Sequence, residues 1–147
     1  MAAEKQYCTF YVDRLFLGLE VSQVQEVIRF QPMTRVPLAS RVVNGLINLR
    51  GQIVTAIDLR RRLELGDRAA DQLPMNVVVR TEDGAVSLLV DEIGDVLDVS
   101  EEAYERPPQT LTGIARELIQ ATYKLESKLL LILDTAKTVH WIEKRES

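Results

Sequence analysis

The sequence is poor in the residues on which cross-links, metal sites and catalysis most often depend. Its 147 residues contain one cysteine, Cys8, and one histidine, His140. A single cysteine excludes an internal disulfide, and we therefore expect an intracellular protein. No group of Cys, His, Asp and Glu has the spacing of metal ligands, and no glycine-rich phosphate loop is present. The sequence thus predicts neither a metal site nor a cofactor.

Long apolar runs are also absent. The longest is Leu129–Leu133, whereas a membrane-spanning helix needs about 20 apolar residues. The segment Met1–Gln6 lacks the apolar core of a signal peptide. We therefore expect a cytoplasmic protein with no direct membrane insertion.

Aromatic residues and positive charge are too scarce for a typical nucleic-acid-binding surface. Aromatic residues make up 5% of the chain and the formal net charge is -4, while nucleic-acid affinity depends on Lys and Arg at phosphates and on stacking. The one basic run, Arg60-Arg61-Arg62, falls on a predicted short helix, where its side chains would be solvated. We expect no nucleic-acid partner. A β-barrel that binds a small ligand or an oligonucleotide remains the alternative to a protein-binding module.

No arrangement of side chains predicts catalysis. Cys8 and His140 lie near opposite ends of the chain, and a nucleophile needs a base together with a third group that orients the base. The acidic pairs Asp91-Glu92 and Glu101-Glu102 are expected in solvated caps and loops. The sequence therefore predicts a binding protein and not an enzyme.

What the sequence does contain is a succession of short segments rich in branched and aromatic residues. Such segments predict strands at residues 7–12, 15–19, 27–30, 46–49, 53–57, 75–81, 85–90, 93–99, 118–125 and 129–133. Capping residues predict helical turns at 22–25, 40–43 and 59–63 and a final helix from Asp134 to about Lys144. Residues 67–73 and 100–113 are predicted loops. The fold class is mainly β.

The predicted elements repeat once along the chain. Residues 21–27 share with residues 90–96 an apolar residue, a capping residue, a second apolar residue and an acid-Val pair. Ile53–Leu59 matches Leu129–Thr135, each a strand that leads into an Asp-capped helix. Two copies of a unit with about five strands would suffice for two small barrels without exposed edges. Chance similarity between amphipathic strands is the alternative.

The segment Asn48-Leu49-Arg50-Gly51 lies at a predicted turn between two strands. A tight turn often needs positive φ, which explains Gly51. Arg50 has no comparable structural reason, since the corresponding turn of the second repeat is Glu126-Ser127. Arg50 is either a solvated turn residue or a cation presented to a partner through its planar guanidinium group.

These residues resemble the CheW family of chemotaxis adaptors. Residues 43–63 follow the family pattern G-[VIL]-[IT]-N-L-R-G-x-I-V, two residues, then [IV]-D-L-R. Residues 16–28 resemble the first helical turn of the family, with its V-x-E-[IV] core, and residues 89–97 its V-D-x-[VI]-x-[DE]-V segment. The resemblance implies one domain over residues 6–143, made of two pseudo-repeated subdomains, with tails at 1–5 and 144–147.

The family resemblance also implies a fold and a function. The fold would be two intertwined five-stranded SH3-like β-barrels with a few short helices and a C-terminal helix. The function would be that of a non-catalytic scaffold that couples a CheA-type histidine kinase to the cytoplasmic tips of chemoreceptors. An adaptor of a non-flagellar chemosensory pathway is an alternative that the sequence leaves open. The expected partner-binding residues are Val24, Glu26, Asn44, Gly45, Asn48, Arg50, Gly51 and Asp91.

Overall fold

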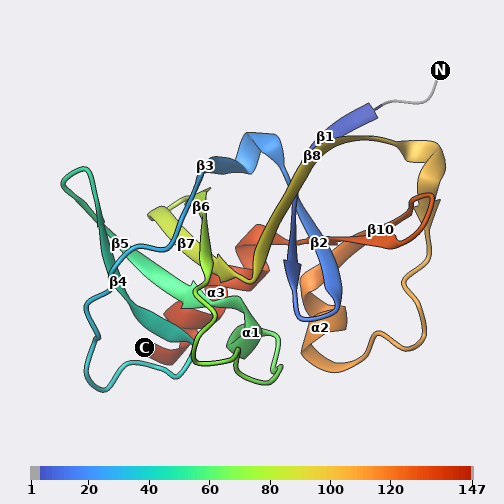
Figure 1. The fold of residues 1–147 in the computed structure, drawn as a ribbon. Helices are drawn as coiled ribbons and strands as arrows, with labels where there is room; N and C mark the ends of the chain where they lie inside the picture. The colour runs from blue at the N-terminus through green and yellow to red at the C-terminus, as the bar shows by residue number, and fades with distance from the viewer. Residues whose placement is uncertain (1–3, 147) are drawn as a thin grey trace.

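The computed structural model describes residues 4–146, with side chains for residues 4–140, and about half of this chain is in strands (Figure 1). The strands are β1 Glu4–Val12, β2 Leu15–Glu20, β3 Val24–Ile28, β4 Val43–Leu49, β5 Gln52–Asp58, β6 Met75–Thr81, β7 Gly84–Val90, β8 Glu92–Ser100, β9 Tyr104–Glu105, β10 Ile119–Lys124 and β11 Leu129–Leu133. The helices are α1 Leu59–Arg62, α2 Gly113–Leu118 and α3 Thr135–Glu146, with 3₁₀ turns η1 Val21–Gln23 and η2 Glu101–Ala103. The predicted mainly β class is confirmed.

The described strands form two sheets, which lie on the two sides of the view in Figure 1. The first sheet has the order β8-β1-β2-β11-β10-β9, and the second has the order β3-β6-β7-β5-β4. In each sheet an antiparallel hairpin pairs through its second strand with a parallel strand, β2 with β11 and β7 with β5. The two orders match position by position, apart from the two-residue strand β9 that extends the first sheet.

The two halves of the chain exchange strands between the sheets. The first hairpin, β1–β2, joins β8, β10 and β11, while β3, β4 and β5 of the same half join the hairpin β6–β7 of the other half. The chain therefore crosses between the sheets after β2 and again after β7. The predicted intertwining of two subdomains is confirmed, and the first sheet has six strands where five were expected.

One apolar core joins the two sheets. Its buried side chains include Phe10 and Leu17 from the first sheet and Ile57 and Leu88 from the second, each with no exposed surface. Two smaller clusters lie within single sheets, one around Tyr7 in the first and one around Ile47 in the second. Because the largest cluster draws on both sheets, the two subdomains share one apolar core.

The short helices agree only in part with the predictions. Asp58 caps α1, since its side chain accepts a hydrogen bond from the Arg60 amide at 3.0 Å, as expected. Ser22 was expected to cap a turn at 22–25, but it lies inside η1, whose first turn has no side-chain cap. Residues 40–43 form a single hydrogen-bonded turn, closed by the Val43 amide on the Ser40 carbonyl, and not a helix.

Helix α2 was not predicted: only its two ends were assigned, Gly113 to a loop and Leu118 to a strand, and the structure contradicts both assignments. It begins at Gly113, whose φ is +65°, and ends at the buried residue Leu118. Ile114 and Ala115 pack against the main core. A helix of six residues has too few turns to show a helical period in the sequence, so its conformation depends on this packing.

The expectation that Arg60-Arg61-Arg62 would be solvated is also wrong. Arg62 is 6% exposed, and its guanidinium donates to the carbonyls of Thr138 and Lys137 at 2.8 and 2.9 Å. The short helix α1 thus ties the second sheet to the start of α3. Among residues 4–146, none of the helices combines the length and apolarity that crossing a bilayer requires.

Candidate functional site

The turn between β4 and β5 has an unusual backbone. Leu49 pairs with Gln52, so Arg50 and Gly51 alone make the turn, with φ of +51° and +89°. Positive φ at both residues is typical of the tight hairpin turns that match strand twist, which favour Asn-Gly. The Asn48 side chain accepts a hydrogen bond from the Gly51 amide at 2.9 Å. Arg50 is therefore held in a conformation that costs a residue with a side chain about 1 kcal/mol.

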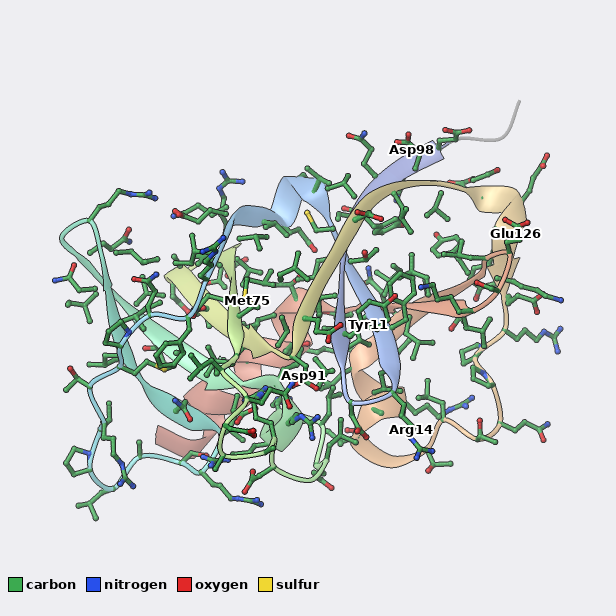
Figure 2. All side chains as sticks on the ribbon, in the orientation of Figure 1. Tyr11, Arg14, Met75, Asp91, Asp98 and Glu126 are labelled. Atoms are coloured by element: carbon green, nitrogen blue, oxygen red, sulfur yellow. The ribbon has the colours of Figure 1, made fainter. Side chains whose placement is uncertain are left out.

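The corresponding turn of the other half differs in conformation as well as in charge. Glu126 and Ser127 connect β10 to β11, and neither is among the residues with positive φ in the described chain. Figure 2 shows Glu126 at the far side of the first sheet. The sequence comparison was right that this fold accepts an acidic residue at such a turn, but the two turns are not geometrically equivalent.

Arg50 forms an ion pair with Glu26 of β3. The Arg50 Nη2 atom contacts the Glu26 Oε2 atom, and the side chains are 75% and 18% exposed, respectively. β3 and β4 are the two outer strands of the second sheet, so this pair links its opposite edges. The structure brings together two predicted site residues, and it leaves most of the Arg50 side chain in solvent.

Gly45 and Asn44 shape the backbone near the start of β4, the strand that leads to this turn. Thr34 and Leu46 exchange two backbone hydrogen bonds of 2.9 and 2.8 Å, which lay the segment before β4 against that strand. A Cβ atom on Gly45 would lie 2.7 Å from the Thr34 carbonyl oxygen, so only glycine fits without a shift. The Asn44 amide donates to the Met33 sulfur at 3.0 Å. Both residues thus have a local structural role.

The apolar residues near the Glu26–Arg50 pair are partly exposed. Val24, half-buried at the start of β3, packs against the main core. Val27 on β3 and Ile53 on β5 are 38% and 61% exposed. The pair therefore lies on strands that also present aliphatic side chains, a combination suited to binding another protein.

Asp91 lies apart from the other predicted residues, between β7 and β8, near the middle of the molecule in Figure 2. It is buried, so the expectation of a solvated cap is wrong for Asp91, although Glu92 beside it is exposed. Its carboxylate accepts hydrogen bonds from Arg60 at 2.7 to 3.0 Å, from Arg68 at 3.0 Å and from the Asp13 amide at 2.7 Å.

Two opposing effects act on the pKa of Asp91. Burial favours the neutral acid, but hydrogen bonds from Arg60, the Asp13 amide and Arg68 outweigh it and hold the pKa of Asp91 below its usual value. Asp13 belongs to the first sheet's hairpin turn and Arg60 follows the second sheet's β5. The carboxylate therefore ties the two subdomains together, and a role for it in partner binding stays a prediction.

Sequence reasoning missed the partners of these charged groups. Arg68 lies in a segment that was predicted only as a polar connector, yet its side chain is 8% exposed and pairs with Asp58 and Asp91. The family pattern around Asp58 and Arg60 was the one available signal. Within the described part of the chain, no group of three or more His, Cys, Asp and Glu could hold a metal ion. The site can bind through charge and apolar contact.

Comparison with known proteins gives a consistent result. The family model described as a CheW-like domain matches residues 6–143. Chemotaxis protein CheW of Treponema pallidum is 30% identical over 136 residues, which are 90% of this chain and 80% of that protein. Chemotaxis protein CheW of Bacillus subtilis is 33% identical over 125 residues, which are 85% of this chain and 80% of that protein.

The fold is also similar to a solved structure. The scaffolding protein TtCheW from Thermoanaerobacter tengcongensis has a TM-score of 0.79 and 27% sequence identity, and the match covers 90% of each chain. Since the family model spans nearly all described residues and the relatives agree with it, the chain belongs to the CheW family of chemotaxis scaffold proteins, which are binding proteins and not enzymes.

Proposed function

We propose that this chain couples a CheA-type histidine kinase to the cytoplasmic domain of a chemoreceptor, as a scaffold in the cytoplasm. Family membership supports an adaptor. The observation that carries the proposal is Arg50, 75% exposed on a two-residue turn and held by Glu26. A charged side chain fixed on a rigid hairpin is prepared to meet a partner without large ordering losses.

The Glu26–Arg50 pair would act as the polar centre of a receptor contact. The ion pair uses one guanidinium nitrogen of Arg50, and further donors of its planar fork stay available to carboxylate or carbonyl oxygens of a partner. Val24 and its exposed neighbour Val27 would receive apolar side chains of a receptor helix, as in other helix-in-groove contacts. Asn48, Gly51, Asn44 and Gly45 set the backbone on which this contact depends.

Coupling needs no chemistry beyond simultaneous binding. A protein that holds the kinase through one surface and the receptor through another raises their mutual effective concentration. Any conformational bias of the receptor can then reach the kinase through the scaffold. The main core continues from one sheet to the other, and this supports a rigid connection between the two surfaces.

Charge reversal at Arg50 tests the proposal. Arg50→Glu places a second carboxylate beside Glu26, so we expect about tenfold weaker binding of a purified receptor cytoplasmic domain. The circular dichroism spectrum should not change, because the side chain is exposed. Binding is measured by titration calorimetry, and kinase activity in the ternary mixture gives the functional readout.

A charge swap separates the two roles of Arg50. Arg50→Glu combined with Glu26→Arg restores the attraction within the protein but inverts the charge at the turn. Receptor binding should stay weak in the swapped protein. Full rescue by the swap would mean that Arg50 acts only within the fold, and wild-type binding by Arg50→Glu would contradict the assignment outright. Recovery of the kinase and receptor in a pull-down also identifies which chemosensory pathway is served.

A further inference from the structure

Basic and acidic residues are concentrated in different segments of this chain, although the net charge is only -4. Residues 27–57 contain four arginines and no Asp, Glu or Lys, whereas residues 81–105 contain nine acidic residues and no Lys or Arg. The basic segment runs from the end of β3 through the loop before β4 and through β4 and most of β5, whereas the acidic segment covers β7, β8 and β9.

The basic segment forms one wall of an open cleft of about 810 Å³. Three arginines line it, Arg35, Arg41 and Arg61, and they share few counter-ions. Asp67 lies 3.7 Å from Arg41 and 3.2 Å from Arg61, and Asp58 lies 3.8 Å from Arg61. The Arg35 side chain has no hydrogen bond or ion pair with any described residue, so the cleft carries uncompensated positive charge at Arg35.

The cleft is built into the fold and does not depend on an occupant to form. The Arg61 guanidinium donates to the Arg41 carbonyl at 3.0 Å, and the Asp58 amide donates to the Val42 carbonyl at 2.9 Å. At its other end the segment is fixed by the two hydrogen bonds between Thr34 and Leu46 described above. A preformed site binds with a smaller loss of conformational entropy.

Aliphatic side chains lie among the arginines. Leu38 is fully exposed and has φ of +64°, a left-handed conformation that aliphatic side chains rarely adopt. Val36 is 37% exposed and Pro37 lies between them. No aromatic residue lines the cleft within the described chain, so stacking of nucleic-acid bases has no platform. The combination suits carboxylates that alternate with apolar side chains.

We propose that this cleft binds an extended acidic segment of a partner protein, with carboxylates at Arg35, Arg41 and Arg61 and an aliphatic side chain at Leu38. The inference rests on the proposed adaptor function, since it specifies that one partner of the adaptor presents an acidic segment. Arginine pairs with carboxylates through two parallel hydrogen bonds, which gives direction as well as attraction.

A labelled peptide tests the charge requirement. The probe is a short fluorescein-labelled peptide containing Glu-Asp-Leu-Glu, and its partner probe has Gln and Asn in place of the acids. We expect the acidic peptide to bind the full chain at least about tenfold more tightly than the neutral one, with an affinity that falls as salt rises. Equal binding of the two peptides, or no binding of either, would overturn the proposal.

Matched variants locate the peptide. Arg35→Glu should weaken binding about fivefold to tenfold, while Arg14→Glu should not change it, since Arg14 is an exposed arginine at the β1–β2 turn, outside this cleft (Figure 2). Leu38→Asn suits a left-handed backbone and removes the aliphatic contact, so about threefold weaker binding is expected. Equal losses for Arg35→Glu and Arg14→Glu would mean that net charge alone is sensed, which contradicts the proposal.

Two further outcomes assign the cleft to another occupant. Tighter binding of a single-stranded oligonucleotide that is lost in Arg35→Glu would make it a nucleic-acid site. Self-association that disappears in Arg35→Glu would make it a contact between copies of this chain. Either result overturns the acidic partner. If the peptide fails while kinase and receptor still bind the protein, the cleft inference falls alone and the adaptor function stands.

Discussion

The molecule contains two ion-pair systems that use the same chemical groups in opposite surroundings. Around Asp91, the side chains of Arg60, Arg68 and Asp91 are 13%, 8% and 7% exposed. At the β4–β5 turn, Arg50 is 75% exposed and Glu26 is its one ion-pair partner among the side chains that the structure describes. A buried charged side chain has lost its hydration and is stable only when ion pairs and hydrogen bonds replace it. An exposed charged side chain stays hydrated, so losing its ion-pair partner costs little free energy. The difference teaches that the first system is buried and holds the fold, whereas the second lies at the surface, where the proposed partner contact would form.

Removal of Asp91 should have the largest effect on stability. Asp91→Ala removes the carboxylate that accepts hydrogen bonds from the buried guanidinium groups of Arg60 and Arg68. We therefore expect a loss of about 3–5 kcal/mol in the free energy of unfolding. Urea denaturation followed by circular dichroism measures it. Glu92→Ala, at the exposed neighbouring position, is the control and should stay within about 0.5 kcal/mol of the wild type. Similar losses of stability in both variants would contradict the conclusion that the buried ion pairs of Asp91 hold the fold.

A smaller loss is expected at Gly45, where the backbone near the start of β4 packs closely against Thr34. Gly45→Ala brings a Cβ atom to 2.7 Å from the Thr34 carbonyl oxygen, and the forced shift should cost about 1–3 kcal/mol. Gly66→Ala is a matched control, because a Cβ atom there meets nothing within 4 Å. It should be neutral or slightly stabilising. Thermal unfolding of the two variants side by side measures the difference, and an unchanged melting temperature for Gly45→Ala would remove the argument from close approach.

The strands could be predicted from the sequence because they follow from local signals, whereas their intertwining was implied by the family resemblance alone. Alternation of apolar residues and the Asp caps mark the elements, and the family pattern supplied the arrangement of subdomains. The closing of each sheet into a barrel stays a prediction. Helix α2 could not be predicted, since its six residues, Gly113–Leu118, owe their conformation to packing on the core.

The contacts among the candidate site residues could not be predicted from the sequence. Glu26 and Arg50 were both expected, yet nothing in the sequence pairs side chains that are 24 residues apart. Arg60 and Asp91 are 31 residues apart, and Arg62 and Thr138 are 76 apart, so the burial of the arginine run depends on tertiary neighbours. The positive φ of Arg50 was missed as well, because an Asn or Gly would be the usual signal for such a turn.

Of these substitutions, Arg50→Asn should change the free energy of unfolding least. It should nevertheless weaken receptor binding. Asparagine tolerates a left-handed conformation better than arginine does, while the exposed ion pair that is lost contributes at most about 1 kcal/mol. These terms oppose each other, so the free energy of unfolding should change by less than about 1 kcal/mol, and a gain would be unsurprising. Receptor binding, measured on the same preparation, should nevertheless weaken.

Unchanged stability together with weaker receptor binding in Arg50→Asn would explain why an arginine occupies this turn. A residue chosen for stability would be Asn or Gly, since both fit the backbone at φ of +51°. If Arg50→Asn leaves the fold as stable as before and weakens binding, the strained conformation is maintained for the partner and not for the hairpin. If the variant instead unfolds readily and binds normally once folded, the Glu26–Arg50 pair belongs with the buried system as a structural contact, and the contrast between the two systems disappears.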